Sequence, residues 1–236
     1  MMKNLCSEAP AEAAEIAQRV RAVRERMAEQ SLRCGRDPAE TALMAVTKTV
    51  PPERVNAAIA AGISLLGENR VQECCEKYQK YACNPDAIHF IGHLQTNKIR
   101  DIIGKIGMVE SVDSLHLAHA LQKELEKGGA PLPILLQVNI GGELSKSGFS
   151  PEETGEALAE IERTCPLLPV RGLMAIPPRT ESDRWFAKMQ ALFEELRAGR
   201  PGFNTLSMGM SGDFEQAIRF GSTQVRIGSA IFGQRS

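Results

Sequence analysis

Short apolar runs alternate with amphipathic segments along most of this chain. From Thr41 onward the runs recur at similar intervals, and a segment with helical spacing of its apolar residues follows each of them. The runs are apolar almost throughout, which is typical of parallel strands that are covered on both faces. The predicted strands are Ala42–Val46, Ile63–Leu66, Ile88–Ile91, Ile106–Val109, Ile134–Val138, Val170–Ile176, Thr205–Met208 and Gln224–Ile227.

The segments between the strands predict helices, because their apolar residues recur every three or four positions. A strand followed by a helix, repeated eight times, predicts a single (β/α)8 TIM barrel of the α/β class. A doubly wound open sheet is the alternative, but no Gly-x-Gly-x-x-Gly motif follows the first strand. The predicted helices are Glu53–Ala61, Asn69–Tyr81, Gln95–Ile103, Ser114–Glu126, Pro151–Arg163, Ser182–Arg197, Asp213–Phe220 and the short Ser229–Phe232.

A further amphipathic helix is predicted before the first strand, over residues 8–33. Because only a short segment remains after the eighth strand, we expect this helix to pack on the barrel and complete its outer ring. No Pro/Gly/Ser-rich linker divides the chain, so residues 1–236 are expected to form one domain. The apolar positions of the helix are Ile16, Val20, Val23 and Met27.

Composition excludes several classes of partner. The chain carries 28 Lys+Arg and 29 Asp+Glu, and this near-neutral balance offers no general field for nucleic acid. No apolar run is long enough to cross a membrane, and the polar N-terminus lacks the apolar core of a signal peptide. The six cysteines form no CxxC pair, and reduced thiols fit the cytoplasm. We therefore expect a cytoplasmic protein that binds neither nucleic acid nor membranes.

Candidate chemistry lies just after the predicted strands, since TIM barrels build their active sites at the carboxyl ends of the strands. Lys48 follows the first strand. A lysine that ends an apolar strand is partly desolvated, which favours the neutral amine that Schiff-base chemistry needs. The alternative is a lysine that only extends along the barrel rim to reach water.

Two loops near the C-terminus supply a second cue. Ser211 and Gly212 precede one predicted helix, and Gly228 and Ser229 open another. Backbone N–H groups at such positions bind phosphate, and barrels often hold phosphate after strands seven and eight. Ser211 as a simple helix cap is the alternative, although it explains only one of the two loops. A reactive lysine opposite a phosphate site implies a phosphorylated aldehyde or ketone.

Two histidine pairs have spacings that occur among metal ligands. His89 and His93 flank a strand end, whereas His116 and His119 lie three apart in a predicted helix. Neither pair has a recognisable third ligand nearby in the sequence, so we predict no metal site.

A set of short motifs links these positions. The motifs are Ala45–Thr49, Gly67–Asn69 with Val71–Glu73, His89–Lys98, Val138–Asn139 followed by Ser145–Gly148, Gly172–Ile176, Leu206–Ser211 and Val225–Gly228. From about Thr41 to the C-terminus they resemble, in the expected order, the pyridoxal phosphate homeostasis proteins, also called the proline synthetase co-transcribed family. That family is similar to the N-terminal barrel of bacterial alanine racemase without its second, β-rich domain.

The resemblance implies pyridoxal 5′-phosphate (PLP) held as an aldimine on Lys48. It also implies that Asn69 lies near the ring and that Arg226 faces the pyridine nitrogen. An arginine stays charged, so it should keep that nitrogen unprotonated and weaken the cofactor as an electron sink. The expected cofactor-binding residues are Lys48, Asn69, Ser207, Ser211, Arg226, Gly228 and Ser229.

Two positions depart from the family pattern. Arg70 stands where the family usually has tyrosine, and Gly141 replaces a common serine before Gly142. The first is expected to change the pocket rim, and the second removes a hydroxyl. Neither alters the lysine, the arginine or the phosphate positions.

The function implied by the resemblance is intracellular PLP homeostasis without clear enzymatic activity. The protein would hold PLP on Lys48 and buffer it or deliver it to PLP-requiring apo-enzymes, and we expect a monomer. A PLP-dependent amino-acid racemase is the alternative, but it needs a second acid or base, and Tyr78 and Tyr81 both lie in a predicted helix. A Schiff-base aldolase is a second alternative, with which Arg226 is less compatible.

Overall fold

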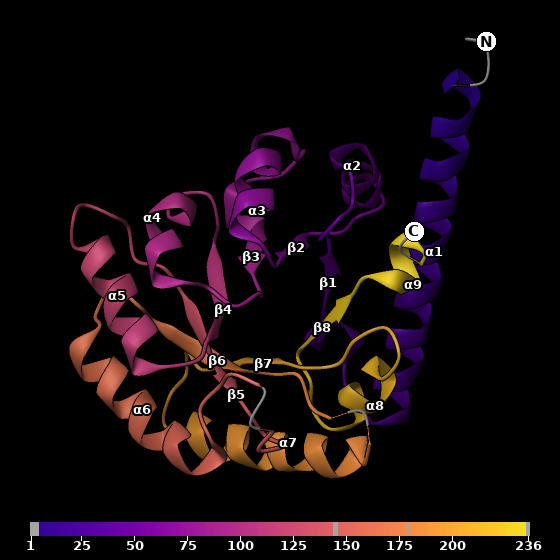
Figure 1. Cartoon of the computed structure of the whole chain (residues 1–236). Coiled ribbons are helices and arrows are strands. Elements are labelled where there is room, and N and C mark those ends of the chain that lie inside the picture. The colour runs from indigo at the N-terminus through magenta and orange to yellow at the C-terminus, as the bar shows by residue number, and fades with distance from the viewer. Residues whose placement is uncertain (1–4, 144–145, 179, 235–236) are drawn as a thin grey trace.

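The strands of this protein lie side by side in chain order. The computed structural model describes residues 5–143, 146–178 and 180–234. Within these residues each strand pairs in parallel with the next, and β8 pairs with β1, so the sheet closes into a barrel (Figure 1). The predicted (β/α)8 fold is therefore confirmed. The strands are β1 (Ala42–Val46), β2 (Leu65–Glu68), β3 (Ile88–Phe90), β4 (Met108–Val112), β5 (Ile134–Val138), β6 (Val170–Ala175), β7 (Thr205–Ser207) and β8 (Gln224–Ile227).

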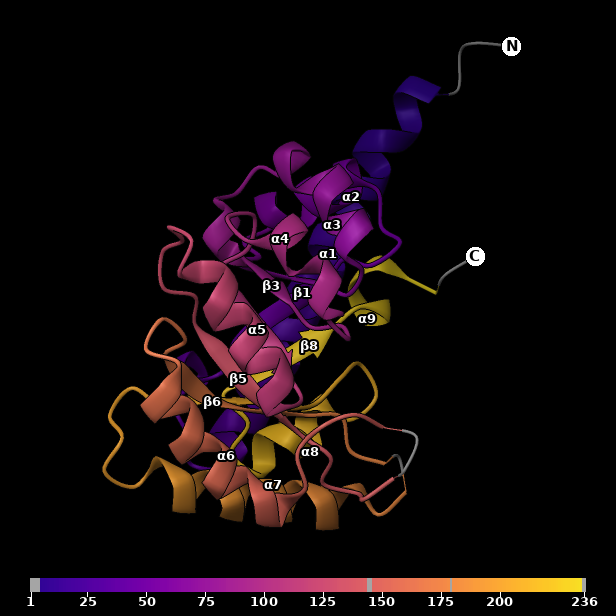
Figure 2. The same cartoon turned by 60° about the vertical axis from the view of Figure 1, so that its left-hand side comes forward.

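Helices surround the barrel, as the turned view in Figure 2 also shows. Ser114 caps α5, and Ser150 and Glu153 form a reciprocal capping box at the start of α6. Within the described residues, no helix is both long and apolar enough to cross a membrane. The helices are α1 (Leu5–Arg33), α2 (Pro52–Ala60), α3 (Val71–Lys77), α4 (Ile99–Ile102), α5 (Leu115–Leu125), α6 (Pro151–Thr164), α7 (Ser182–Arg197), α8 (Phe214–Arg219) and α9 (Ser229–Phe232), with 3-10 turns η1 (Pro38–Glu40), η2 (Tyr78–Lys80), η3 (Pro85–Ala87) and η4 (Thr96–Lys98).

Helix α1 runs along one side of the barrel and contacts α2, α8 and α9 (Figure 1). Arg26 of α1 also forms an ion pair with Glu215 of α8, with 2.9 Å between Nε and Oε1. Because α9 has only four residues, α1 covers a side of the barrel that α9 is too short to cover. The apolar stripe of α1 is buried and consists of Ile16, Val20, Val23 and Met27.

The inside of the barrel is filled by side chains, and Gly67 shows how closely they pack. A Cβ atom on Gly67 would lie 2.7 Å from Met44 Sδ and 2.9 Å from Ile91 Cδ1. Met44 therefore points inward from β1. Residues one position away, such as Leu43 and Ala45, point outward and join the apolar layer under the helices.

Some element boundaries differ from the predicted ones. The strands predicted over 63–66 and 106–109 instead begin at Leu65 and Met108 and extend through Glu68 and Val112. The apolar runs end before Gly67 and Glu110, but the strands continue because Glu68 and Glu110 are buried within them and hydrogen-bonded.

Two predicted helices are also shorter than expected. The segment predicted as a helix over 69–81 contains α3 and the turn η2, and it ends where Tyr81 becomes extended. In this extended conformation, the Tyr81 hydroxyl donates to buried Glu68. The segment predicted over 95–103 divides into η4 and α4.

Candidate functional site

Lys48 lies two residues beyond β1, at the carboxyl end of the barrel. Met44 and Val46 occupy the inner face of β1, and Lys48 continues that alternation as a half-buried side chain. Between them, Thr47 points outward, where its hydroxyl oxygen lies 2.6 Å from Glu68 Oε1. The local pattern of strand and turn thus places Lys48 at the mouth of the barrel.

Helix α3 holds the backbone on both sides of Lys48. The backbone N–H of Thr49 donates to Glu73 Oε1, and the Lys77 ammonium donates to the carbonyl of Thr47 at 3.4 Å. Glu73 and Lys77 also pair with each other. Thr49 adopts a φ of 61°, a left-handed conformation that is unfavourable for a non-glycine residue. These contacts fix the turn in which Lys48 lies.

Asn69 follows β2, the strand next to β1. Its Oδ1 atom is buried, and no hydrogen-bond partner for it lies among the described residues. A buried acceptor without a donor is costly, so it marks a place for a ligand that donates a hydrogen bond. Gly92 packs directly on this segment, because a Cβ there would lie 2.1 Å from the carbonyl oxygen of Asn69.

Arg226 lies deeper in the barrel. It pairs in register with Met44, four residues before Lys48, and its side chain is buried. Nη1 donates to Ser207 Oγ at 2.7 Å, and Nη2 donates to the carbonyl of Ala175 at 2.8 Å. Burial lowers the pKa of Arg226, although the charge of Glu110 opposes this, and a guanidinium still keeps its proton.

Beneath Arg226 lies a group of buried polar side chains that sequence reading did not predict as functional, apart from Ser207. Ser207 Oγ lies 2.7 Å from Glu110 Oε2, and Gln224 Nε2 donates to Glu110 Oε1 at 2.7 Å. His89 Nδ1 lies 2.6 Å from the same Oε1. The one signal in the sequence was Glu110 itself, a charged residue directly after an apolar run.

The loops after β7 and β8 meet at Ser211. The N–H groups of Gly228 and Ala230 point at Ser211 Oγ over 3.3 and 3.4 Å. Ser211 does not cap α8, because Asp213 occupies the N-cap position. Two N–H groups that converge on a hydroxyl at such long distances are well placed for a stronger acceptor, such as a phosphate oxygen.

A cavity of about 110 Å³ lies beside these loops. Thr49 lines it from the loop after β1, and Gly228 and the exposed Ser229 line it from the loop after β8. The loop that carries Lys48 and the loop that carries Gly228 and Ser229 therefore line the same cavity.

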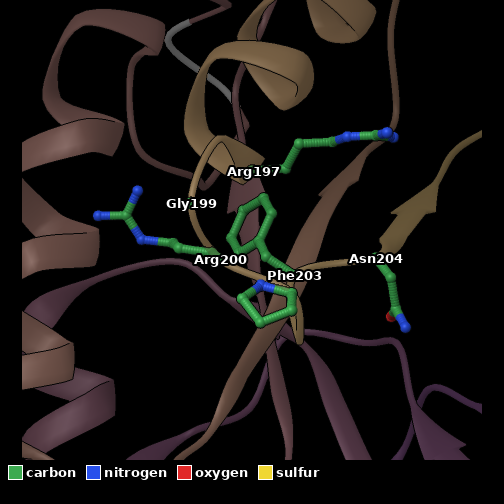
Figure 3. Close-up of a pocket in the computed structure, with 6 residues that line it drawn as sticks. Arg197, Gly199, Arg200, Phe203 and Asn204 are labelled. Atoms are coloured by element: carbon green, nitrogen blue, oxygen red, sulfur yellow. The ribbon is translucent and has the colours of Figure 1, made fainter.

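A larger hollow of about 440 Å³ lies at the opposite end of the barrel, where the chain passes from α7 into β7 (Figure 3). The Arg197 and Arg200 side chains at its edge point away from each other (Figure 3). Each is paired with a glutamate, Arg197 with Glu194 and Arg200 with Glu162. None of the predicted site residues lines this hollow.

The two departures from the family pattern lie at the rim. Arg70 is exposed and stands at the N-cap of α3. Gly141 packs against Pro178, and a Cβ atom there would lie 2.6 Å from Pro178 Cγ. A serine at position 141 would clash with this proline, so the loops after β5 and β6 account for the glycine.

The histidines at the end of β3 contact different carboxylates. Buried His89 faces Glu110, whereas exposed His93 pairs with Asp113, with 3.1 Å between Nδ1 and Oδ2. In the part of the chain that the structure describes, no group of three His, Cys, Asp or Glu residues could hold a metal ion.

Sequence comparison decides the family. The profile of the alanine racemase N-terminal domain family matches residues 12–236. The pyridoxal phosphate homeostasis protein of Pseudomonas aeruginosa is 45% identical over 224 residues, which cover 93% of this chain and 96% of that protein. The chain belongs to the pyridoxal phosphate homeostasis protein family. The Aquifex aeolicus member is 40% identical, over 92% of this chain and 97% of that protein.

Solved structures agree with this placement. A protein from Bifidobacterium adolescentis superposes with a TM-score of 0.88 at 35% identity, over 94% of this chain and 96% of its own. PipY of Synechococcus elongatus PCC7942, solved with PLP bound, gives 0.76 at 30% identity, over 92% of this chain and all of PipY. Corynebacterium glutamicum alanine racemase shares the fold, with a TM-score of 0.72 at 16% identity, and 94% of this chain covers 62% of the racemase.

Proposed function

We propose that this protein binds PLP at the carboxyl end of the barrel and serves in PLP homeostasis. Relatives that match more than nine-tenths of the chain are named pyridoxal phosphate homeostasis proteins, and PipY was solved with PLP bound. The observation that carries the proposal is the arrangement around Asn69. Its orphaned acceptor lies at the end of the strand next to the Lys48 strand, in a barrel whose interior also holds the Arg226 guanidinium.

The residues present fit the groups of PLP one by one. The Lys48 amine would hold the aldehyde, and Asn69 Oδ1 would accept a hydrogen bond from the ring hydroxyl. Arg226 would donate to the pyridine nitrogen. Ser211 and the N–H groups that converge on it would hold the phosphate, together with Gly228 and Ser229.

Binding without catalysis is the role that these side chains support best. Bound PLP supplies an electrophilic aldehyde and an electron-withdrawing ring. Arg226 donates a hydrogen bond but keeps its own proton, so it leaves the ring nitrogen unprotonated and the ring a weak electron sink. The protein would therefore retain the cofactor rather than use it in turnover.

Racemisation needs a second acid or base, and neither of the described tyrosines, Tyr78 and Tyr81, lies inside the barrel where it could serve as one. The Tyr81 hydroxyl donates to Glu68, which lies on the outer side of β2, away from the barrel interior. Burial, together with the charge of Glu68, raises the pKa of Tyr81 above its ordinary value. Tyr78 lies in η2 on the outer ring, beneath the Lys105 ammonium.

We further propose that the protein acts as a cytoplasmic monomer that supplies PLP-requiring apo-enzymes. The cysteines whose side chains are described are all free thiols, as expected for a reducing compartment. Among the described side chains, the exposed large apolar residues are Leu32 and Ile176, which lie on different elements and form no large apolar patch. Half-buried Lys48 at the barrel mouth can be reached by a recipient.

The test is uptake of PLP by the purified chain. Addition of PLP should produce a visible absorption band, and borohydride should then attach the cofactor to Lys48, as peptide mass mapping would show. Lys48→Ala should lose the band, whereas Lys105→Ala, a lysine of the outer ring, should keep it. A wild-type chain with neither band nor adduct would disprove PLP binding. Racemisation of amino acids faster than with free PLP would disprove the non-catalytic role.

A further inference from the structure

The hydroxyl of Ser207 has no capacity left for a cofactor. A serine hydroxyl offers one proton and two lone pairs. Ser207 Oγ accepts from Arg226 Nη1 at 2.7 Å and from Gln224 Nε2 at 3.1 Å, and it donates to Glu110 Oε2 at 2.7 Å. Its side chain is also fully buried. Ser207 therefore acts on Arg226 rather than on a ligand.

Glu110 closes the network from the opposite wall of the barrel. It lies on β4, whereas Arg226 and Gln224 lie on β8, four strands away around the barrel. Both carboxylate oxygens are bonded, Oε2 to Ser207 and Oε1 to Gln224 and His89. A carboxylate only accepts, so His89 Nδ1 carries the proton of their shared hydrogen bond.

The network also balances charge among buried groups. Burial by itself raises the pKa of Glu110, but the hydrogen bond and charge of His89, with the charge of Arg226, lower it below its ordinary value. Glu110 is thus the buried anion that faces the buried Arg226 cation through one hydroxyl. A buried charge without such a partner is strongly destabilising.

Two bonds determine the plane of the Arg226 guanidinium. Nη1 is held by Ser207 and Nη2 by the carbonyl of Ala175 on β6. The guanidinium is a rigid planar fork, so these two contacts set its direction. The Ala175 contact is a backbone group, which leaves Ser207 as the side chain that controls the orientation.

We propose that Ser207 and Glu110, supported by His89 and Gln224, are positioning residues that aim the Arg226 guanidinium at the ring nitrogen of PLP. This inference rests on the proposed function. Without the Ser207 hydroxyl, Nη1 loses its acceptor and Glu110 loses a donor, so the guanidinium turns away from the ring. The ring nitrogen then becomes accessible to protons from the solvent.

The experiment compares Ser207→Ala and Glu110→Gln with Ser222→Ala in the full chain. Ser222 is an equally buried serine whose hydroxyl contacts only the backbone carbonyls of Leu206, Met208 and Gln224. Glu110→Gln keeps the volume and an acceptor oxygen but removes the charge. Three readouts are needed: the dissociation constant for PLP, the pH titration of the visible band, and thermal unfolding of the PLP-free chain.

We expect Ser207→Ala and Glu110→Gln to bind PLP about tenfold more weakly than wild type, the effect of one hydrogen bond to a charged group. Their visible bands should also titrate at a shifted pH, which a merely structural role would not cause. Ser222→Ala should lose thermal stability but match wild type in affinity and titration. Borohydride should still attach PLP to Lys48 in every variant.

The outcomes separate this inference from the proposed function. If wild type takes up no PLP, the proposed function fails and the inference falls with it. If wild type binds PLP while Ser207→Ala and Glu110→Gln match Ser222→Ala in affinity and titration, only the inference is overturned. If one variant does not fold, the other decides alone, because Ser207→Ala removes the hydroxyl between Glu110 and Arg226 and Glu110→Gln removes the charge.

Discussion

The backbone N–H of Thr49 donates to the Glu73 carboxylate over 2.5 Å, and this bond ties the turn after Lys48 to the first turn of α3. Thr49 adopts a left-handed φ of 61°, which is unfavourable for a residue with a side chain. Such strain is typical of functional sites and persists where surrounding contacts hold it. Here the holding contact is the Glu73 carboxylate, next to the amine that we propose to bind the cofactor.

Replacement of Thr49 should reveal this strain. Thr49→Gly should be more stable than Thr49→Ala by about 1 kcal/mol, because glycine adopts a positive φ without a steric cost. In a regular helix or strand the order is the reverse. Urea unfolding of the two variants gives the difference in the free energy of unfolding. An alanine variant as stable as the glycine variant would show that position 49 is unstrained.

Glu110 should make the protein sensitive to acid. Its pKa in the folded protein lies below the ordinary value of 4.5, so its stabilising contribution is complete above that value and is lost as the pH falls through the folded pKa. Glu110→Gln should therefore be less stable than wild type at about pH 7, and the gap should narrow between about pH 5 and pH 3. Urea unfolding across that pH range measures the difference in the free energy of unfolding between the two proteins. A difference that stays constant with pH would contradict the prediction.

Glu68 should have the opposite dependence on pH. Burial raises its pKa, against hydrogen bonds from Thr47 and Tyr81, and its Oε2 has no partner among the described residues. The folded state then holds a proton that the unfolded state has released, so this carboxyl costs stability as the pH rises above its ordinary value of 4.5. Glu68→Gln should gain stability relative to wild type between about pH 5 and pH 7. Urea unfolding of both proteins at the two pH values shows whether Glu68→Gln raises the free energy of unfolding relative to wild type as the pH rises.

Gly92 should tolerate no side chain. Its missing Cβ would meet the backbone oxygen of Asn69 at 2.1 Å, and backbone cannot move aside cheaply. Gly92→Ala should cost about 1–3 kcal/mol. Gly155→Ala is the matched control, because Gly155 lies inside α6 with its nearest neighbour, Leu196 Cδ2, at an ordinary 3.7 Å. The control should gain about 0.5–1 kcal/mol in thermal or urea unfolding.

We propose that α1 belongs to the same folding unit as the barrel. Ile16 on its apolar stripe is 1% exposed, so Ile16→Ala should destabilise the whole chain by about 2–4 kcal/mol. Arg21→Ala, on the exposed face of the same helix, should change stability by less than about 0.5 kcal/mol. A single unfolding transition, shifted as a whole by Ile16→Ala, is the expected result. An early separate transition for α1 would contradict the proposal.

The barrel itself was predictable because its signals are local. Apolar runs and helical spacing each occupy a few residues, and their order along the chain indicates a (β/α)8 fold without any knowledge of contacts. The errors arose where polar residues lie inside strands. The predicted runs end before Gly67 and Glu110, yet the strands continue, because groups distant in the sequence donate hydrogen bonds to Glu68 Oε1 and to both carboxylate oxygens of Glu110.

The sequence by itself determined which residues lie at the carboxyl ends of the strands, Lys48 among them, because parallel strands in a barrel all end at the same side. Only the tertiary structure decided how the buried groups pair. Ser207 and Glu110 are 97 residues apart in the sequence. Closure of the barrel between β8 and β1 brings their side chains within hydrogen-bond distance. Hydrogen bonds need contacts within about 3 Å, and no local pattern in a sequence specifies such a contact across a barrel.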